Sequence, residues 1–141
     1  MSNRRQAKAL ARLKQLKQAN AMAAQRQAIT ARAQVAATEQ SILAIDQRVI
    51  QEASAMADYA DTPALGRWAD LMDHRRSSLA QRKAAEQGLA DALAQKAAAA
   101  QLTVEQYSAL LKDLNRQHRQ QLRRAAALTE WEALAQSFWR D

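Results

Sequence analysis

Few side chains in this sequence could take part in catalysis or bind a metal ion. The two histidines, His74 and His118, lie far apart in the chain and near opposite ends of the hairpin argued below, so they cannot share a metal. The carboxylate pair Asp70 and Asp73 has no concave site around it, and no glycine-rich phosphate loop, nucleophile elbow or HExxH spacing occurs. We therefore expect no enzyme, no cofactor, no metal site and no small-molecule substrate.

The composition favours long helices. Hydrophobic residues make up 48% of the 141 residues, but about half of them are alanine, so the core should be a thin seam of packed side chains. The chain has two glycines and one proline, which leaves little room for strands or loops. It has no cysteine, which excludes a disulfide framework and a thiolate metal site and agrees with a reducing compartment.

The stretch DYADTPALGRW, residues 58–68, contains the proline and one of the glycines. Asp61 or Thr62 can cap a following helix, and Pro63 suits its first turn. We expect an all-α fold in which two long helices form an antiparallel coiled-coil hairpin with its turn near residues 60–63. The whole chain, 1–141, is then a single elongated hairpin, with helices over about 3–60 and 63–138.

Apolar residues at alternating spacings of three and four predict the packing seam of the first helix. Upstream, Leu10, Leu13 and Leu16 lie on a shifted phase, while Lys14 and Lys17 occupy the continued seam. This shift predicts a stutter near residues 20–27. The predicted seam of the first helix is Ala28, Ala31, Val35, Thr38, Ile42, Ile45, Val49, Glu52, Met56 and Tyr59.

The seam of the second helix is looser. Thr103 and Gln106 match a capping box, so a kink near 101–104 is an alternative to the continuous helix that we prefer. Its apolar positions are Trp68, Met72, Leu79, Leu89, Leu93, Ala100, Tyr107, Leu110, Leu114, Leu128, Trp131 and Phe138, and its polar ones are Arg75, Arg82, Lys96, Gln117, Gln121 and Arg124.

The second helix should extend beyond the first. A turn centred near residue 62 pairs residue i with about residue 124 − i, so Met1 lies opposite residues 121–123. The remainder still carries Leu128, Trp131, Leu134 and Phe138 at helical spacing. This overhang either folds back or frays, or it is a docking surface for another protein, which we favour because tryptophan is frequent among interface anchors.

Positive charge is concentrated at the open end of the predicted hairpin. The net charge is +7, and residues 1–38 contain no acidic side chain. In the predicted register this segment lies beside further basic residues of the second helix, so the open end should attract nucleic acid, anionic lipid or an acidic protein surface. The basic residues are Arg4, Arg5, Lys8, Arg12, Lys14, Lys17, Arg26 and Arg32 of the first helix, and Arg116, His118, Arg119, Arg123 and Arg124 of the second.

A basic first helix, the pair Arg67-Trp68 soon after the turn, and a protruding C-terminal end together resemble the FliJ family of flagellar export proteins, and are similar to the YscO-type stalk proteins of injectisomes. The resemblance covers the length of the chain. It implies a cytoplasmic coupling shaft, peripheral at the inner-membrane export apparatus. Its termini would dock into a hexameric secretion ATPase, and its turn end would face an export gate protein, with export chaperones as further partners. The implied ATPase-docking residues are Arg4, Arg5, Lys8, Arg12, Arg119, Arg123, Arg124, Leu128, Trp131 and Phe138, and the turn-end residues are Arg67, Trp68, Leu71 and Met72.

The competing class is a basic coiled coil that binds nucleic acid. The cations of residues 1–38 could neutralise several phosphates, with a steep salt dependence. Residues 1–38 contain no aromatic side chain, so stacking on bases has no support there. The same lack weighs against a helix lying on an anionic membrane.

Overall fold

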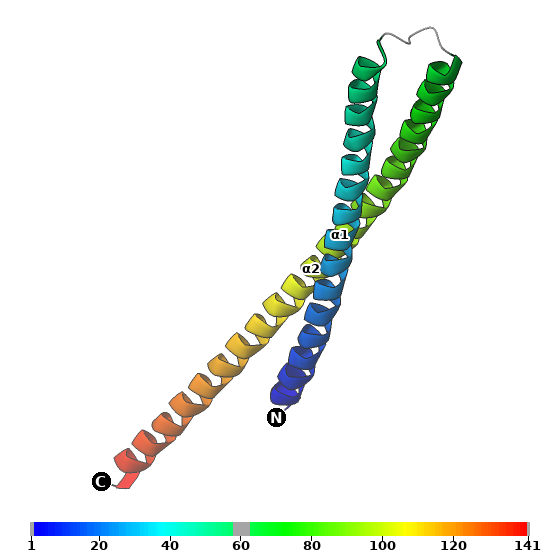
Figure 1. Cartoon of the computed structure of the whole chain (residues 1–141). Helices are drawn as coiled ribbons and strands as arrows, with labels where there is room; N and C mark the ends of the chain where they lie inside the picture. Colours follow the sequence, from blue (N-terminus) through cyan, green and yellow to red (C-terminus); the bar gives the residue numbers. More distant parts are fainter. Residues whose placement is uncertain (1, 58–62, 141) are drawn as a thin grey trace. The chain divides into compact units, whose positions relative to one another are not determined.

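The computed structural model describes residues 2–57 and 63–140, and these residues form two helices. Helix α1 spans Ser2–Ala55 and helix α2 spans Pro63–Arg140 (Figure 1). No strand occurs in the described ranges. The predicted all-α fold, a hairpin of two long antiparallel helices, is confirmed.

The helix ends follow from local chemistry. Helix α2 begins at Pro63, as predicted, where the missing N–H group removes no helical hydrogen bond. Helix α1 ends at Ala55, earlier than the expected boundary near residue 60, and the N–H of Met56 donates to the carbonyl of Glu52 at 2.9 Å. The proposed capping residues, Asp61 and Thr62, lie outside the described residues.

The helices contribute to two compact units. Unit 1 comprises Met1–Ala21 and Ala99–Asp141, and unit 2 comprises Met22–Ala98. Each unit therefore contains one segment of α1 and one segment of α2, and each has a seam between them.

The seam of α1 in unit 2 matches the prediction over residues 28–52. Ala28, Val35 and Thr38 are buried, and Ala31 is half-buried. Met56, expected to extend the seam, is exposed, and Tyr59 lies outside the described residues. The predicted seam residues Ile42, Ile45, Val49 and Glu52 are all half-buried.

The predicted stutter in the first helix is wrong. The heptad spacing continues upstream without a break, and Lys14 and Lys17 are half-buried on it, whereas Leu13 and Leu16 are exposed. Lysine can occupy such a position because its aliphatic stem covers apolar surface while its ammonium group stays in water. The upstream seam consists of Ala7, Leu10, Lys14, Lys17, Ala21 and Ala24.

The predicted seam of α2 is right in part and shifted by one residue in part. Leu89 and Leu110 are exposed, and the neighbouring residues Ala90 and Leu111 face α1 instead; Ala90 is only 2% exposed. A small residue suits this position because the opposing seam is also rich in alanine, so the helices can pack closely. The confirmed positions are Trp68, Met72, Leu79, Leu93, Ala100, Tyr107 and Leu114, whereas the predicted polar positions Arg75, Arg82, Lys96, Gln117, Gln121 and Arg124 are all exposed.

Helix α2 is continuous through residues 101–107, as preferred over a kink. The hydroxyl of Thr103 donates to the carbonyl of Ala99, one turn earlier, at 3.1 Å. It therefore does not act as a cap, because its hydrogen bond is directed back into the same helix.

Candidate docking surfaces

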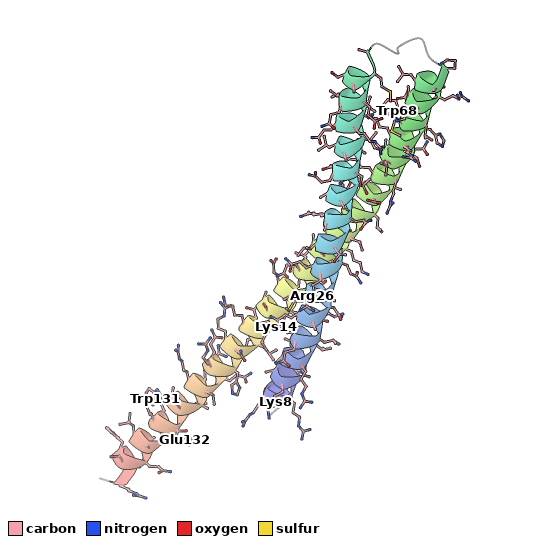
Figure 2. All side chains as sticks on the ribbon, in the orientation of Figure 1. Lys8, Lys14, Arg26, Trp68, Trp131 and Glu132 are labelled. Carbon is pink, nitrogen blue, oxygen red and sulfur yellow. The ribbon has the colours of Figure 1, made fainter. Side chains whose placement is uncertain are left out.

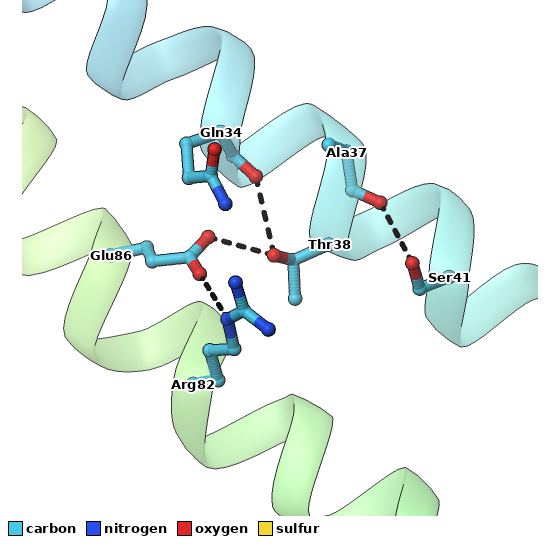
Figure 3. Close-up of polar contacts among 6 residues, drawn as sticks. All are labelled: Gln34, Ala37, Thr38, Ser41, Arg82 and Glu86. Carbon is cyan, nitrogen blue, oxygen red and sulfur yellow. Dashed lines mark hydrogen bonds and ion pairs between the residues drawn. The ribbon is translucent and has the colours of Figure 1, made fainter.

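A polar cluster lies on the seam of unit 2 (Figure 3). Thr38 is 4% exposed, and its hydroxyl donates to Oε2 of Glu86 at 2.7 Å and lies 3.2 Å from the carbonyl oxygen of Gln34. The Nε of Arg82 donates to the other carboxylate oxygen, Oε1, at 2.7 Å. The shorter bond from Thr38 goes to the charged acceptor, as expected for a charge-assisted hydrogen bond.

Two ion pairs between the helices fix the same antiparallel register as the contact of Thr38 with Glu86. Lys83 Nζ lies 3.3 Å from Glu39 Oε1, and Arg76 Nε lies 2.7 Å from Asp46 Oδ1. Residues 38 and 86, 39 and 83, and 46 and 76 therefore lie opposite one another. This antiparallel pairing agrees within about two residues with the register expected from the turn position.

The seam cluster lowers the pKa of Glu86. The largest cause is the hydrogen bond from Thr38, and Arg82 adds a second hydrogen bond and a favourable charge, while desolvation opposes both. The pKa of Arg76 is raised, mainly because its guanidinium donates a hydrogen bond to Asp46. Both groups have a structural role, because each forms a hydrogen bond that joins α2 to α1.

The basic residues named as docking candidates are all exposed. They lie in unit 1, on the first turns of α1 and on the later part of α2. None of them forms an ion pair within the ranges 2–57 and 63–140, so their charges stay available to a partner. They are Arg4, Arg5, Lys8, Arg12, Arg119, Arg123 and Arg124; Figure 2 labels Lys8 among the side chains near the start of α1.

One basic stripe was not recognised as a unit from the sequence. Lys112, Arg116, Arg119 and Arg123 follow spacings of four, three and four, which place them on one face of α2. All four are exposed, and among residues 2–57 and 63–140 only Arg116 of the four forms an ion pair, with its NH2 nitrogen 4.0 Å from Asp113 Oδ1. The helical spacing alone could have found this stripe.

The C-terminal segment of α2 is uncovered. Every residue from 119 to 140 is exposed, and the side chains of Trp131 and Phe138 are 72% and 87% exposed. Leu128 and Leu134 lie on the same side of the helix by spacing, and Trp139 is also exposed. Trp139 was missed because it lies one residue beyond the periodic positions. The segment, which includes Trp131 in Figure 2, thus presents large apolar side chains to solvent.

The candidates near the turn separate into surface and core. Arg67 is exposed and Leu71 is 46% exposed, whereas Trp68 is half-buried. Met72 is only 4% exposed, so it belongs to the core of unit 2 and its proposed role as a contact residue needs correction. Met72 occupies a seam position, and a seam side chain is covered by the opposing helix.

No constellation of catalytic type emerges in the described residues. His74 is exposed, His118 is half-buried, and no group of three or more metal-ligating side chains is found in the described part of the chain. The grooves are open: one in unit 1 is lined by residues such as Lys14, Glu105 and Ser108, and one in unit 2 by residues that include Leu89 and Leu93.

In the part of the chain that the structure describes, no helix combines the length and the apolar character needed to cross a membrane. A comparison with protein-family models, with curated proteins and with solved structures finds no match.

Proposed function

We propose that this chain is a non-enzymatic coupling component of a type III protein export apparatus, flagellar or injectisome, acting as the central stalk of a hexameric secretion ATPase. In this proposal the paired ends of α1 and α2 dock into the ATPase ring. The turn end contacts the export gate protein, and export chaperones are further partners. The protein works in the cytoplasm, at the periphery of the inner-membrane apparatus.

The observation that carries this proposal is the uncovered C-terminal segment of α2. Exposure of large aromatic side chains such as Trp131 and Phe138 to water is unfavourable, and such side chains are typical anchors of protein interfaces. Exposed cations accompany them in unit 1, including Arg119 and Arg123 on the same helix. A partner with apolar pockets surrounded by acidic groups would complement this surface.

The chain would act through two docking surfaces instead of a reaction centre. The surface of unit 1 would bind the ATPase, with the cations guiding encounter and the aromatic side chains holding the complex. Near the turn, Arg67, Trp68 and Leu71 would provide the second contact, and Met72 would support them from the core. Coupling between the two surfaces is favoured because α1 and α2 are each continuous over the whole of their length.

A pull-down tests this proposal. The tagged full chain is incubated with nuclease-treated lysate of its source organism, beside a chain that ends at Ala127 and therefore lacks Leu128, Trp131 and Phe138. We expect the full chain to recover a hexameric secretion ATPase, and the shortened chain to recover much less. Recovery that is equal for both chains would exclude the C-terminal segment as the anchor.

A second function has one specific observation in its favour. The stripe of Lys112, Arg116, Arg119 and Arg123 faces one side of α2, where it could follow a phosphate backbone. Binding of nucleic acid by these cations would be independent of sequence, because no base-reading element accompanies them.

The salt dependence of binding separates the two functions. If nucleic acid is the partner, changing Lys112 and Arg119 to alanine weakens binding and flattens its dependence on salt, with a change in slope of about one per lost phosphate contact. Ending the chain at Ala127 then has little effect, since all four stripe residues remain. If the ATPase is the partner, the shortened chain is the more damaged one.

A further inference from the structure

Helix α1 carries a column of exposed apolar residues outside its seam. Met22, Ile29, Leu43 and Ile50 are 55%, 59%, 50% and 70% exposed, and they recur every seven residues, with Ala36 completing the series. Residues seven apart lie on one face of a helix that takes part in a coiled coil. All five belong to unit 2. Single exposed apolar residues are common, but an aligned column of them is typical of an interaction surface.

The column is symmetric about Ala36. Met22 and Ile50 lie equally far from Ala36 along the chain, as do Ile29 and Leu43. If two copies of α1 cross antiparallel at Ala36, each large residue meets a large residue of the other copy, and the small alanines allow close approach at the centre. The contact would extend over about 42 Å of helix, at 1.5 Å per residue.

The charges beside the column differ in sign on the two sides of Ala36. Arg26 and Arg32 precede Ala36, whereas Glu39 and Asp46 follow it. In an antiparallel pair the basic half of one copy lies over the acidic half of the other; a parallel pair would place like charges together. The heptad positions of Arg32 and Glu39 are the same, so these two residues flank the column on one side.

We propose that the occupant of this face is a second copy of the chain, and that α1 pairs with α1 of that copy about a two-fold axis at Ala36. Arg32 is exposed and forms no ion pair among residues 2–57 and 63–140, so it can pair with Glu39 of the second copy, twice by symmetry. Glu39 already lies 3.3 Å from Lys83, and its side chain is still 49% exposed. A carboxylate can accept from both cations.

The hairpin leaves room for this partner. The seam residues that face α2, such as Ala28 and Val35, lie one residue before the column residues Ile29 and Ala36, on a different face of α1. A second copy on the column therefore does not displace α2. This inference is independent of the proposed function, because the column lies in unit 2 and the ATPase-docking candidates lie in unit 1.

Sedimentation equilibrium over a wide range of concentrations tests the dimer. The double variant Ile29→Glu/Leu43→Glu introduces two negative charges into the column. The control is Leu102→Glu, which introduces a negative charge at a similarly exposed leucine of unit 1. We expect the wild-type chain and the control to dimerise and the double variant to stay monomeric. Circular dichroism should show the same helicity for all three chains, because the changes are on exposed helix surface.

Disulfide trapping tests the orientation, and the absence of native cysteine makes it clean. Chains carrying Ile29→Cys or Leu43→Cys are oxidised alone and as a mixture. We expect the mixture to form the 29-to-43 cross-link and each variant alone to form little dimer. A wild-type chain that stays monomeric, a double variant that dimerises as well as wild type, or an Ile29→Cys chain that cross-links efficiently to itself would overturn the proposal.

Discussion

The hydroxyl of Thr38 donates a hydrogen bond of 2.7 Å to the carboxylate of Glu86 on the opposite helix. Both residues lie on the seam, where an apolar pair would bury more area. A polar pair at such a position favours one register, since a sliding of the helices would break the hydrogen bond from Thr38 and leave Arg82 to donate to the carboxylate. The ion pairs of Glu39 with Lys83 and of Asp46 with Arg76 support the same register.

Removal of the Thr38 hydroxyl should weaken unit 2. We expect Thr38→Val to lower the urea midpoint of unfolding, although valine is the more apolar residue, because Glu86 then loses its buried donor. The control is Thr30→Val, since the Thr30 hydroxyl is exposed and donates only to the Arg26 carbonyl. A midpoint raised by Thr38→Val would show that the seam tolerates loss of this bond.

The contribution of Glu86 should depend on pH. Its pKa is lower in the folded chain than in the unfolded one, so the carboxylate stabilises the fold above its unfolded pKa, and this stabilisation is lost as the pH falls through the folded pKa. We expect the difference in free energy of unfolding between wild type and Glu86→Gln to be constant near neutrality and to shrink below about pH 4. Urea unfolding at several pH values measures it. A difference that grows in acid would contradict this account.

Replacing Gly88 should stabilise the protein. Gly88 lies in the interior of α2, is exposed, and has no atom within 4 Å of the place that a Cβ would take. We expect Gly88→Ala to raise the free energy of unfolding by about 1 kcal/mol, because alanine has the higher helix propensity. Chemical denaturation measures the change. An unchanged or lower stability would contradict this account.

The lysines on the seam of unit 1 should limit its stability. Lys17 is half-buried, so Lys17→Leu should extend the apolar seam and raise the free energy of unfolding by about 1 kcal/mol. Its neighbour Leu16 is exposed, and Leu16→Lys should change stability by less than about 0.5 kcal/mol. If the effects were reversed, the first helix would follow the shifted phase expected from its leucines.

The sequence predicted the fold and register well because proline, glycine and the clear heptads of residues 28–52 leave few alternatives. The prediction was wrong where the many alanines made the phase of the heptad repeat ambiguous. The sequence predicted Leu89 on the seam, but close packing of the helices favoured its smaller neighbour Ala90 there. Lys14 and Lys17 were excluded for their charge, although their stems can pack. The exposed column on α1 was not predicted, because its residues recur only once every seven positions and the predicted seam lies on another face of the helix.

The docking candidates were predicted unevenly for a physical reason. The basic and aromatic residues of unit 1 could be found from the sequence, since their types and helical spacing can be read there directly. Met72 could not be assigned to core or surface, because an apolar residue near a turn suits either. Its burial follows from packing against α1, which depends on the phase of both helices.

Binding of the purified chain to the purified hexameric secretion ATPase of the same organism tests the central claim most directly. The affinity of wild type is compared with that of Trp131→Ala/Phe138→Ala and of the control Leu102→Ala, an exposed leucine before the uncovered segment. We predict tight binding by wild type and control, and a loss of at least about 2 kcal/mol, some thirtyfold in affinity, for the double variant. Equal binding by all three chains, or no binding by wild type, would contradict the stalk proposal.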